Sequence, residues 1–551
     1  MKVVPLIILL CLLITAAGAA EITEFCPDTW LKGEADEYIV INGTGPARGL
    51  AITDGEGMIT FPEDTLLSGR TVIARQADAY YGVHGSLPDY EWLDSDPEVP
   101  DMRLTGDLRL ANRADSLSLL LDNEVVQRVA WPEDVCTREG QVHVLENGVW
   151  DRRPHLIGQS ALTPARYEDV SLLAFVSPDS SYEALNTALD DADSEVLLNV
   201  YEFTDARTAE RLATLSREGV SVRVLLEGGP VGGISDEERA VAGLLTEAGA
   251  WVGMMTSTDE AHARYRFDHA KYMVIDDEAV LVMSENLKPT GVPERGQTGN
   301  RGWGVYITDT GVAEEFSRVF ELDAGGRDIM PMEGEGLPEA GDDGETYVPL
   351  FRPEEFTGAV VTPVFSPDTS CLIEELVRSA EVSVDIEQAY IKDWKDGSNP
   401  YLEAAIEAAG RGVEVRILMD SYWFNIEGDD DNDEMAESIN ALAQEQGLPM
   451  EARCVYLKEA GFLKIHNKGV IVDNRKVLVS SINWNENSPS FNREAGVIID
   501  EPGAGAYFTE VFESDWNLSA DKAPDLTKMW VAAGVILLLL LIYAGRIIKN
   551  Y

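Results

Sequence analysis

The segment from His269 to Asp276 reads His-Ala-Lys-Tyr-Met-Val-Ile-Asp, and the segment from His466 to Asp473 reads His-Asn-Lys-Gly-Val-Ile-Val-Asp. Both segments follow the pattern H-x-K-x-x-x-x-D. Two copies among only six histidines would rarely arise by chance. The pattern therefore predicts one structural unit that the chain uses twice.

A serine and an asparagine follow each copy at the same spacing. On an extended strand, residues two positions apart project from the same face, so each His lies beside its Lys and each Ser beside its Asn. The candidate catalytic residues are His269, Lys271, Ser284 and Asn286, with His466, Lys468, Ser481 and Asn483. Asp276 and Asp473 stand an odd seven positions after their histidines. We expect these aspartates to anchor turns and to take no part in the chemistry.

The repeat extends to the scale of a domain. The sequence Val-Ser-Pro-Asp-Ser-Ser at 176–181 matches Phe-Ser-Pro-Asp-Thr-Ser at 365–370, and apolar strands and helices alternate after both. Such alternation predicts an α/β fold with a mixed sheet flanked by helices. We expect two pseudo-symmetric halves at 165–324 and 359–518, with a linker rich in Gly, Pro and Glu at 325–358.

These features resemble the phospholipase D superfamily, whose signature is H-x-K-x-x-x-x-D followed by G-S-x-N, normally present twice per active site. The resemblance covers residues 170–518. Both copies depart from it at the glycine, which is replaced by Met283 and Ser480. Glu494 stands where the family often has a carboxylate that supports the histidine, whereas Gly302 occupies the matching position in the first copy. The two histidines are therefore not expected to be equivalent.

The resemblance implies cleavage of a phosphodiester by double displacement, without a metal or another cofactor. One histidine attacks phosphorus, and the other protonates the leaving oxygen. The Lys, Ser and Asn side chains neutralise charge on the phosphoryl oxygens. A carboxylate beside an imidazole favours its charged form. If Glu494 reaches His466, then His466 is the proton donor and His269 is the nucleophile.

Two alternatives follow from the same residues. Each histidine can simply close a buried hydrogen-bond network beside its lysine. The chain can also be a family member that has lost its activity, because both glycines are replaced and Gly302 stands in place of a glutamate.

Both ends of the chain carry apolar segments. Residues 1–20 have the charge and apolar run of a secretory signal peptide, with small residues at the cleavage point. Residues 529–545 contain no charge and are followed by Arg546 and Lys549, which predicts a transmembrane helix with a cytoplasmic C-terminus. We expect a single-pass protein of the cell membrane whose catalytic domain is extracellular and lies close to the bilayer.

Residues 21–150 have short β-rich runs separated by Gly, Pro and Asp, which predicts an all-β, immunoglobulin-like sandwich. The sequence Thr-Asp-Gly-Glu-Gly at 53–57, Phe61-Pro62 and the run that ends at Ala74-Arg75 resemble a lamin-tail domain. Such a module holds a partner or acts as a spacer.

The formal net charge of −54 argues against a dedicated nucleic-acid-binding protein, because phosphate-binding grooves are normally basic. Positive charge is nevertheless concentrated near both motifs, where it favours binding of one phosphate. These basic residues are Arg264, Arg266, Lys271, Arg295 and Arg301, with Lys464, Lys468 and Arg493.

Other features are less specific. Four cysteines remain after the signal peptide, and their positions favour disulfides between Cys26 and Cys136 and between Cys371 and Cys454. The aromatic run at 422–424 predicts either packing under a lid or contact with an acyl chain. The acidic run at 429–434 lacks the glycine of a calcium-binding loop.

The sequence therefore predicts a phosphodiesterase or phosphatidyl transferase of the phospholipase D superfamily that acts through a phosphohistidine. We expect a membrane phospholipid as its substrate and a monomeric protein. The alternatives are a nuclease with the same machinery, which the negative charge disfavours, and a non-catalytic cell-surface binding protein.

Overall fold

The computed structural model describes residues 20–518, apart from 32, 132–139, 147, 151–154, 259–261, 337, 339–345, 396, 398 and 429–430. Within this part of the chain, no helix is long and apolar enough to span a bilayer. The predicted membrane helix at 529–545 and residues 1–19 of the predicted signal peptide lie outside the described residues, as does Cys136.

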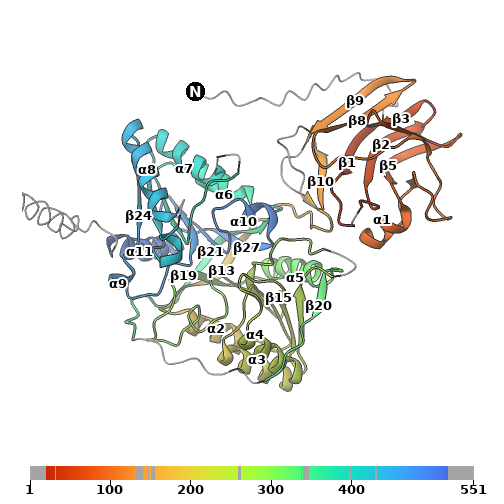
Figure 1. Ribbon diagram of the computed structural model, residues 1–551. Helices are drawn as coiled ribbons and strands as arrows, with labels where there is room; N and C mark the ends of the chain where they lie inside the picture. The colour runs from red at the N-terminus through yellow and green to blue at the C-terminus, as the bar shows by residue number, and fades with distance from the viewer. Residues whose placement is uncertain are drawn as a thin grey trace, which may run out of the picture.

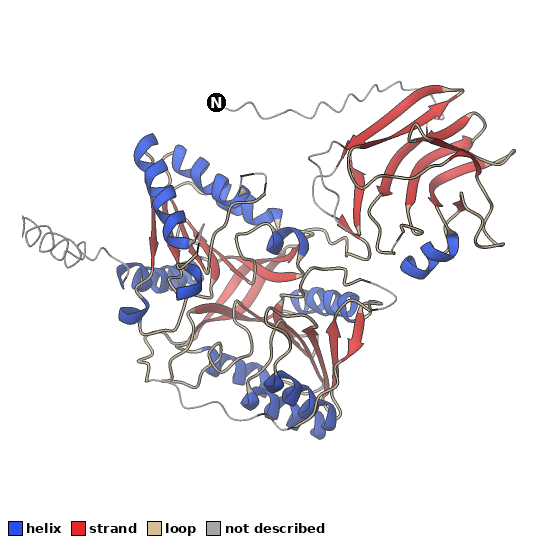
Figure 2. Cartoon of the chain, in the orientation of Figure 1, coloured by secondary structure: helices blue, strands red, loops and turns tan. Residues whose placement is uncertain are grey.

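The N-terminal residues form two sheets that share one core (Figures 1 and 2). One sheet has the order β11-β10-β1-β2-β5-β6, with β12 paired to β10, and the other has the order β7-β4-β3-β8-β9. Ile39 and Ile41 from the first sheet pack against Ile52 and Leu119 from the second. The relation to lamin-tail domains remains a prediction. The elements are β1 (Glu21–Cys26), β2 (Tyr38–Pro46), β3 (Leu50–Thr53), β4 (Gly57–Thr60), β5 (Leu66–Ala74), α1 (Ala77–His84), β6 (Tyr90–Glu91), β7 (Arg103–Gly106), β8 (Asp115–Leu121), β9 (Glu124–Trp131), β10 (Gln141–Glu146), β11 (Val149–Trp150) and β12 (His155–Leu156).

The remaining residues form two halves with matching elements. The first half contains β13 (Tyr167–Ser177), α2 (Ser181–Asp190), β14 (Glu195–Val200), α3 (Ala206–Glu218), β15 (Ser221–Glu227), α4 (Asp236–Glu247), β16 (Trp251–Met255), β17 (Lys271–Ile275), β18 (Ala279–Met283), β19 (Gly302–Thr308) and α5 (Thr310–Ala324). The second contains β21 (Glu354–Ser366), α6 (Cys371–Arg378), β22 (Ser383–Gln388), α7 (Pro400–Gly410), β23 (Glu414–Met419), the short 3₁₀ helix η1 (Trp423–Asn425), α8 (Asn432–Gln446), β24 (Met450–Cys454), α9 (Leu457–Ala460), β25 (Lys468–Val472), β26 (Lys476–Ser480), α10 (Asn487–Phe491), β27 (Glu494–Asp500) and α11 (Pro502–Leu518). Between the halves, β20 (Ile329–Pro331) pairs with β16, so the predicted linker extends the sheet.

The strands of both halves join in one sheet of fifteen strands within the described residues. Its order is β20-β16-β15-β14-β17-β18-β19-β13-β21-β27-β26-β25-β22-β23-β24. Apart from β20, the strands on the two sides of the antiparallel pair β13 and β21 follow the same order: β19, β18, β17, β14, β15 and β16 on one side correspond to β27, β26, β25, β22, β23 and β24 on the other. The pseudo-twofold axis therefore passes between these two strands, and the predicted mixed sheet flanked by helices is present in both halves.

Helices cover the sheet in two ways (Figures 1 and 2). Helices α2, α3 and α4 pack on one face of the first half, and α6, α7 and α8 pack on the second half. Helices α5 and α11 share a third core that joins the halves. In this core, Phe316 of α5 packs against Phe365 of β21, and Trp303 of β19 packs against Phe508 of α11.

The predicted disulfide between Cys371 and Cys454 is wrong, because Cys454 is a free thiol. Its strand, β24, packs against α8, whereas Cys371 begins α6, which packs against α7. Burial raises the pKa of the Cys454 thiol to about 12.

Two buried arginines also link the halves. Arg301, just before β19, pairs through Nε with Asp515 of α11 at 2.8 Å. Arg493, just before β27, pairs through Nε with Asp323 of α5 at 2.8 Å. All four side chains are at most 1% exposed. Each half therefore helps to neutralise a buried charge of the other, together with Asp179 beside Arg301 and Asp368 beside Arg493 in the arginine's own half.

The Asp515→Asn variant tests this link. It removes one of the two carboxylates that neutralise the buried Arg301 guanidinium, while Asp179 stays 2.7 Å from its Nη1, so we expect the free energy of unfolding to fall by about 1.5–3 kcal/mol. Denaturant unfolding, followed by tryptophan fluorescence, measures the change. The control is Glu407→Gln, which removes a surface ion pair to Arg378 and should change stability by less than about 0.5 kcal/mol. Equal effects of the two variants would contradict the interpretation.

Candidate active site

The two motifs occupy equivalent places at the ends of β17 and β25. Lys271 and Lys468 are the first residues of these strands, and the histidines stand two residues earlier. The antiparallel strands β18 and β26 bring the Ser-x-Asn segments back to the same end. The period-two spacing in the sequence therefore places the polar groups of each copy together.

Each histidine loop is held by the main chain of the opposite half. The amide of His269 donates to the carbonyl oxygen of Arg493 at 2.7 Å, and the amide of His466 donates to that of Arg301 at 2.8 Å. Acidic residues at the ends of β15 and β23 hold the same loops, because Glu227 accepts the amide of Asp268 and Asp420 accepts the amide of Ile465. The two motifs thus form one site.

Both imidazoles open onto one cavity of about 160 Å³. The His269 and His466 side chains are 14% and 17% exposed. The cavity combines hydrogen-bond donors with carboxylates, and it is lined by Tyr201, Glu202, His269, Glu285, Asn286, Lys288, Thr290, Gly291, Asn300, Lys464 and His466.

The carboxylates contact the histidines in a crossed arrangement. Glu494 Oε2 lies 2.7 Å from Nδ1 of His269, so the expectation that Glu494 supports His466 is wrong. The reason is the exchange of loops between the halves, which places the Arg493 segment beside the first motif. His466 instead faces Glu285, whose Oε1 lies 3.4 Å from its Nδ1. That separation is an ion-pair distance, but it is too long for a good hydrogen bond.

The titration behaviour of the two pairs differs. Burial lowers the pKa of His269, and the adjacent Glu494 partly opposes this effect. Burial lowers the pKa of His466 further, since Lys468, Lys464, Lys271 and His269 all repel its charged form. Burial raises the pKa of Glu285 to about 7. Burial would also raise the pKa of Glu494, but contact with His269 lowers it below its ordinary value. Of the two imidazoles, His269 is therefore the more readily protonated.

The motif lysines are buried beside their own histidines. Lys271 Nζ donates to the His269 carbonyl oxygen at 2.6 Å, and Lys468 donates to that of His466 in the same way. Burial lowers the pKa of Lys271 to about 8 and lowers that of Lys468 well below its ordinary value. An anion in the cavity would relieve this destabilisation.

The serines join the turns to the neighbouring strands. Ser284 Oγ accepts the amide of Trp303 at 3.1 Å, and Ser481 Oγ accepts the amide of Ala495 at 3.0 Å. Of the two asparagines, Asn286 lines the cavity and Asn483 does not. Asn286 donates to Glu202 at 2.9 Å, and within the described residues nothing donates to the buried Oδ1 atoms of Asn286 and Asn483.

The replaced glycines do not break the equivalence of the turns. Ser284 and Ser481 donate their amides to the carbonyl oxygens of Trp303 and Ala495 at 3.0 and 2.9 Å. Opposite Ser480 stands Gly496, where an added Cβ would lie 2.5 Å from the Ser480 Cβ. A glycine on the facing strand therefore provides the room that Ser480 needs.

Asp276 and Asp473 lie away from the imidazoles. Asp276 accepts amides of Asp193, Ser194 and Glu195, which precede or begin β14. Asp473 accepts the amides of residues 381–383, at the start of β22. Both aspartates thus hold the turn after the motif strand against a neighbouring strand.

The predicted cluster of basic residues is only partly present. Arg301, Arg493 and Arg264 are buried in ion pairs with aspartates and do not line the cavity. Arg295 pairs with Glu183 at the surface, and Arg266 donates to Asn487. The cationic side chains at or beside the cavity are lysines 271, 288, 464 and 468. The arginines were wrongly predicted to bind phosphate, because the sequence does not show which carboxylates pair with them.

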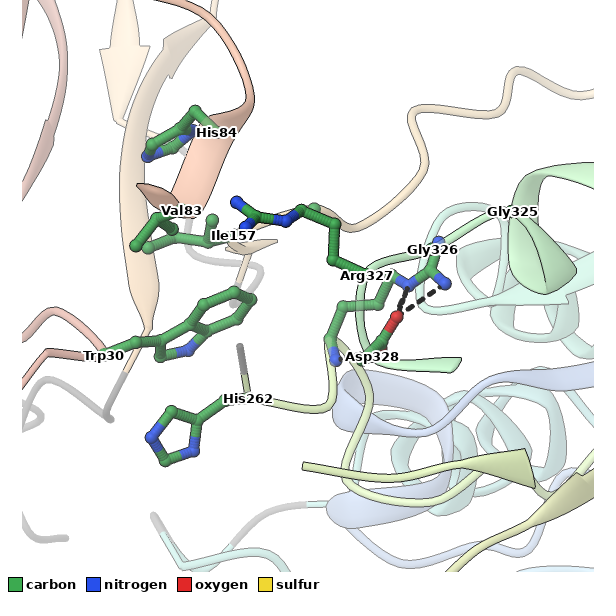
Figure 3. Close-up of a pocket in the computed structure, with 11 residues that line it drawn as sticks. Trp30, Val83, His84, Ile157, His262, Gly325, Gly326, Arg327 and Asp328 are labelled. Carbon is green, nitrogen blue, oxygen red and sulfur yellow. Dashed lines mark hydrogen bonds and ion pairs between the residues drawn. The ribbon is translucent and has the colours of Figure 1, made fainter. Parts of the chain in front are cut away.

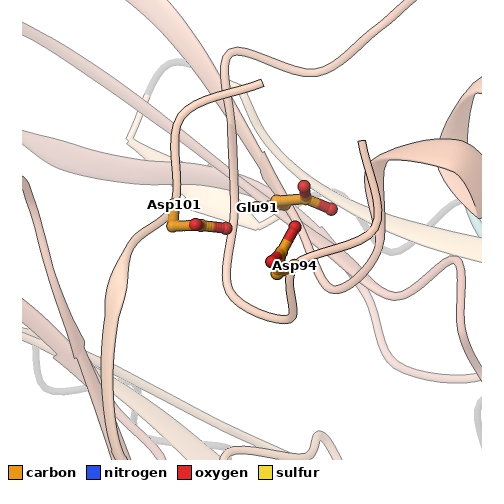
Figure 4. A group of neighbouring side chains, drawn as sticks. All are labelled: Glu91, Asp94 and Asp101. Atoms are coloured by element: carbon orange, nitrogen blue, oxygen red, sulfur yellow. The ribbon is translucent and has the colours of Figure 1, made fainter. Parts of the chain in front are cut away.

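Two other polar regions lie outside this site. A hollow of about 240 Å³ lies between Trp30 and His84 of the N-terminal module, His262 of the first half and Arg327 of the segment that follows α5 (Figure 3). Glu91, Asp94 and Asp101 lie close enough together to hold a cation (Figure 4). Both oxygens of Glu91 already accept hydrogen bonds, from the amides of Ala77, Ser95 and Asp96 and from the Ser95 hydroxyl. Glu91 therefore orders its own loop.

Comparison with known families gives a clear result for the two halves. A family described as "Cardiolipin synthase, PLD-like domain" matches residues 185–324 and 373–516. The chain belongs to this family. Cardiolipin synthase A of Cronobacter sakazakii is 24% identical to it over 338 residues, which are 59% of this chain and 63% of that protein.

Solved structures of similar proteins include two from bacteria. Phosphatidylserine synthase of Haemophilus influenzae gives a TM-score of 0.47 at 14% identity and covers 67% of this chain and 94% of its own. Nuc of Salmonella typhimurium, a phospholipase D family member, gives a TM-score of 0.24 at 24% identity and covers 30% of this chain and 98% of its own.

Several site residues were missed in the sequence. Glu285 and Glu202 line the cavity, and Glu227 and Asp420 hold the histidine loops. The last two had a visible signal, since an acidic residue follows the apolar strand in both copies. Glu285 had a weaker signal, because it stands inside the Ser-x-Asn segment of the copy that has Gly302.

The pKa of Lys271 leads to a prediction for anion binding. Tungstate in the cavity should return this pKa from about 8 toward its ordinary value, so binding takes up protons and weakens as pH rises above 8, by up to about tenfold per unit. Calorimetry at pH 8.5 in buffers of different ionisation enthalpy measures the uptake. Lys271→Met should reduce it, and Lys458→Met on the exposed helix α9 should not. Binding without proton uptake in the unsubstituted protein would contradict the prediction.

Proposed function

We propose that the protein is a phosphodiesterase or phosphatidyl transferase that acts on a membrane phospholipid through a phosphohistidine. The observation that carries the proposal is the opening of His269 and His466 onto one cavity, each beside a buried carboxylate. One phosphorus atom between two imidazoles can be attacked from one side while its leaving oxygen is protonated from the other.

The observed contacts reverse the roles expected from the sequence. His466 is the more readily neutral imidazole, and His269 is the more readily protonated one. In the proposed first step, Nε2 of His466 attacks phosphorus, the bond to the headgroup oxygen breaks, and that oxygen takes a proton from His269. In the second step, water or an alcohol gives a proton to His269 and attacks phosphorus, and the phosphorus–nitrogen bond breaks.

The lysines supply the positive charge that the reaction needs. Lys271 and Lys468 flank the histidines, and Lys464 lines the cavity. Lys288 also lines it but is paired with Glu202 at 3.1 Å. A bound phosphodiester thus meets a cationic site although the whole chain is strongly anionic.

Exposed aromatic side chains near the cavity support a lipid substrate. Trp423 and Phe424 are 58% and 49% exposed, rather than packed under a lid. Lys464, which lines the cavity, lies with Nζ 5.6 Å from the centre of the Phe424 ring. Aromatic groups at such a rim suit the interface of a bilayer. The negative charge of the chain disfavours the nuclease alternative.

The proposal keeps the topology expected from the sequence. A membrane helix at 529–545 would hold the catalytic halves outside the cell and close to their lipid substrate. The acceptor of the phosphatidyl group is water or an alcohol, whichever molecule reaches the phosphohistidine in the second step. Assays on phosphatidylglycerol and phosphatidylcholine vesicles, with and without added glycerol, measure both products, and single- and double-stranded DNA test the nuclease.

An activated reporter separates the two histidines. Bis(p-nitrophenyl) phosphate has a good leaving group and needs little general-acid assistance. We therefore expect His269→Asn to release a burst of p-nitrophenol and to accumulate phosphohistidine, because its second step lacks a base. His466→Asn should give no burst. Mass spectrometry of the trapped protein should place the phosphoryl group at position 466, and a phosphorylated His269 in the unsubstituted protein would refute the assignment.

The aromatic rim gives a separate prediction. Trp423→Ala with Phe424→Ala should lower activity on vesicles by about tenfold or more, because two apolar groups worth about 1.5–3 kcal/mol each no longer enter the interface. Activity on a short-chain phospholipid below its micelle concentration should change little. Tyr81→Ala removes a comparably exposed ring from α1 and serves as the control. Equal losses on both substrates would exclude an interfacial role.

A further inference from the structure

We infer that Glu285 is the positioning residue of His466 and that it replaces a carboxylate missing from the first half at Gly302. The inference rests on the proposed phosphodiester chemistry and deepens it. The two halves would then carry the same functional group, delivered from two different positions of the chain.

The sheet register fixes which positions are equivalent. In the first half, Gly302 of β19 pairs with Ser177 of β13. In the second half, Glu494 of β27 pairs with Ser366 of β21. Gly302 is therefore the structural counterpart of Glu494. The counterpart of Glu285, within Ser481-Ile482-Asn483, is the buried Ile482.

The two carboxylates nevertheless reach matching surroundings. The side-chain amide of Asn300 donates to Glu285 Oε2 at 2.9 Å. The amide of Asn492, its counterpart two residues before Glu494, donates to Glu494 Oε1 at 3.0 Å. In each half the other carboxylate oxygen faces Nδ1 of the histidine from the opposite half. The asparagine and the imidazole that contact the carboxylate are equivalent in the two halves, whereas the carboxylate comes from a different position of the chain in each.

Gly302 provides the room for this exchange. A Cβ at this position would lie 2.4 Å from Glu285 Oε1 and 2.7 Å from its Cγ. The constraint is space rather than backbone conformation, because Gly302 is not among the glycines with positive φ. The pocket thus excludes carboxylate side chains from positions 285 and 302 together. The Ser284 Oγ would also lie 2.7 Å from a Cβ at position 302, so this hydroxyl must turn aside when a glutamate at 302 takes the place of Glu285.

Packing alone does not explain a glutamate at position 285. Ile482 shows that an apolar side chain fills the counterpart position in the second half. Glu285 is 2% exposed, and burial without a partner disfavours its charged form. Its Oε1 has no hydrogen-bond donor in the described residues and lies toward His466 Nδ1. At 3.4 Å the two atoms are not hydrogen-bonded. An approach of a few tenths of an ångström would let Nδ1–H donate to this oxygen, which favours the tautomer that leaves Nε2 free for phosphorus.

Four variants test the inference, with thermal unfolding as a check on folding. Glu285→Ile copies the second half and removes the carboxylate, so turnover should fall by about 10²-fold or more. Gly302→Glu alone should also be impaired, since its Cβ collides with Glu285. The double variant Glu285→Ile/Gly302→Glu should recover at least about tenfold over either single variant. Glu278→Gln, in the exposed turn between β17 and β18, is the matched control and should match the unsubstituted enzyme.

The assay is single-turnover phosphohistidine formation from bis(p-nitrophenyl) phosphate, so it reports on the histidine rather than on lipid binding. Rescue by the double variant supports the inference that the carboxylate can come from either position. If Glu285 had only a structural role, the activity losses of the two single variants would add up in the double variant. If the unsubstituted enzyme forms phosphohistidine, two results overturn the inference: full activity of Glu285→Ile, or no recovery of activity in the double variant. An unsubstituted enzyme without phosphohistidine overturns the proposed function instead.

Discussion

The active site depends on the exchange of main-chain hydrogen bonds between the two halves. His269 is held by the carbonyl oxygen of Arg493, and His466 by that of Arg301. These bonds fix the loops that carry the imidazoles, so neither half positions its own histidine alone. The antiparallel pair β13 and β21 brings the loops into reach of each other.

Electrostatics reinforces this exchange. The arginines whose carbonyl groups hold the histidine loops are themselves buried, and each pairs with an aspartate on a helix of the other half. Burial of an unpaired guanidinium would be costly. The same segments therefore supply the hydrogen bonds, the buried ion pairs and, in the second half, Glu494. Positioning and stability are coupled at one place in the fold.

The duplicated architecture could be predicted from the sequence because its signal is local. The motif spacing and the alternating apolar runs identify β17, β18, β25 and β26 and the side chains that they present. Contacts between distant segments left no such signal. The partner of Glu494 was assigned to the wrong histidine, since the crossing of the loops depends on tertiary packing. Arg301 and Arg493 looked like phosphate ligands because the aspartates that neutralise them lie about 170 to 210 residues away.

The joining of the halves through β13 and β21 has a consequence for folding. Residues of β13 pair with β19 on one side and with β21 on the other. During synthesis the first half is complete before β21 emerges. Until then, the amide and carbonyl groups on the edge of β13 that will pair with β21 have no partner strand. Such an edge readily accepts a strand from another molecule. An exchange of β21 between two chains would rebuild both sites in an intertwined dimer.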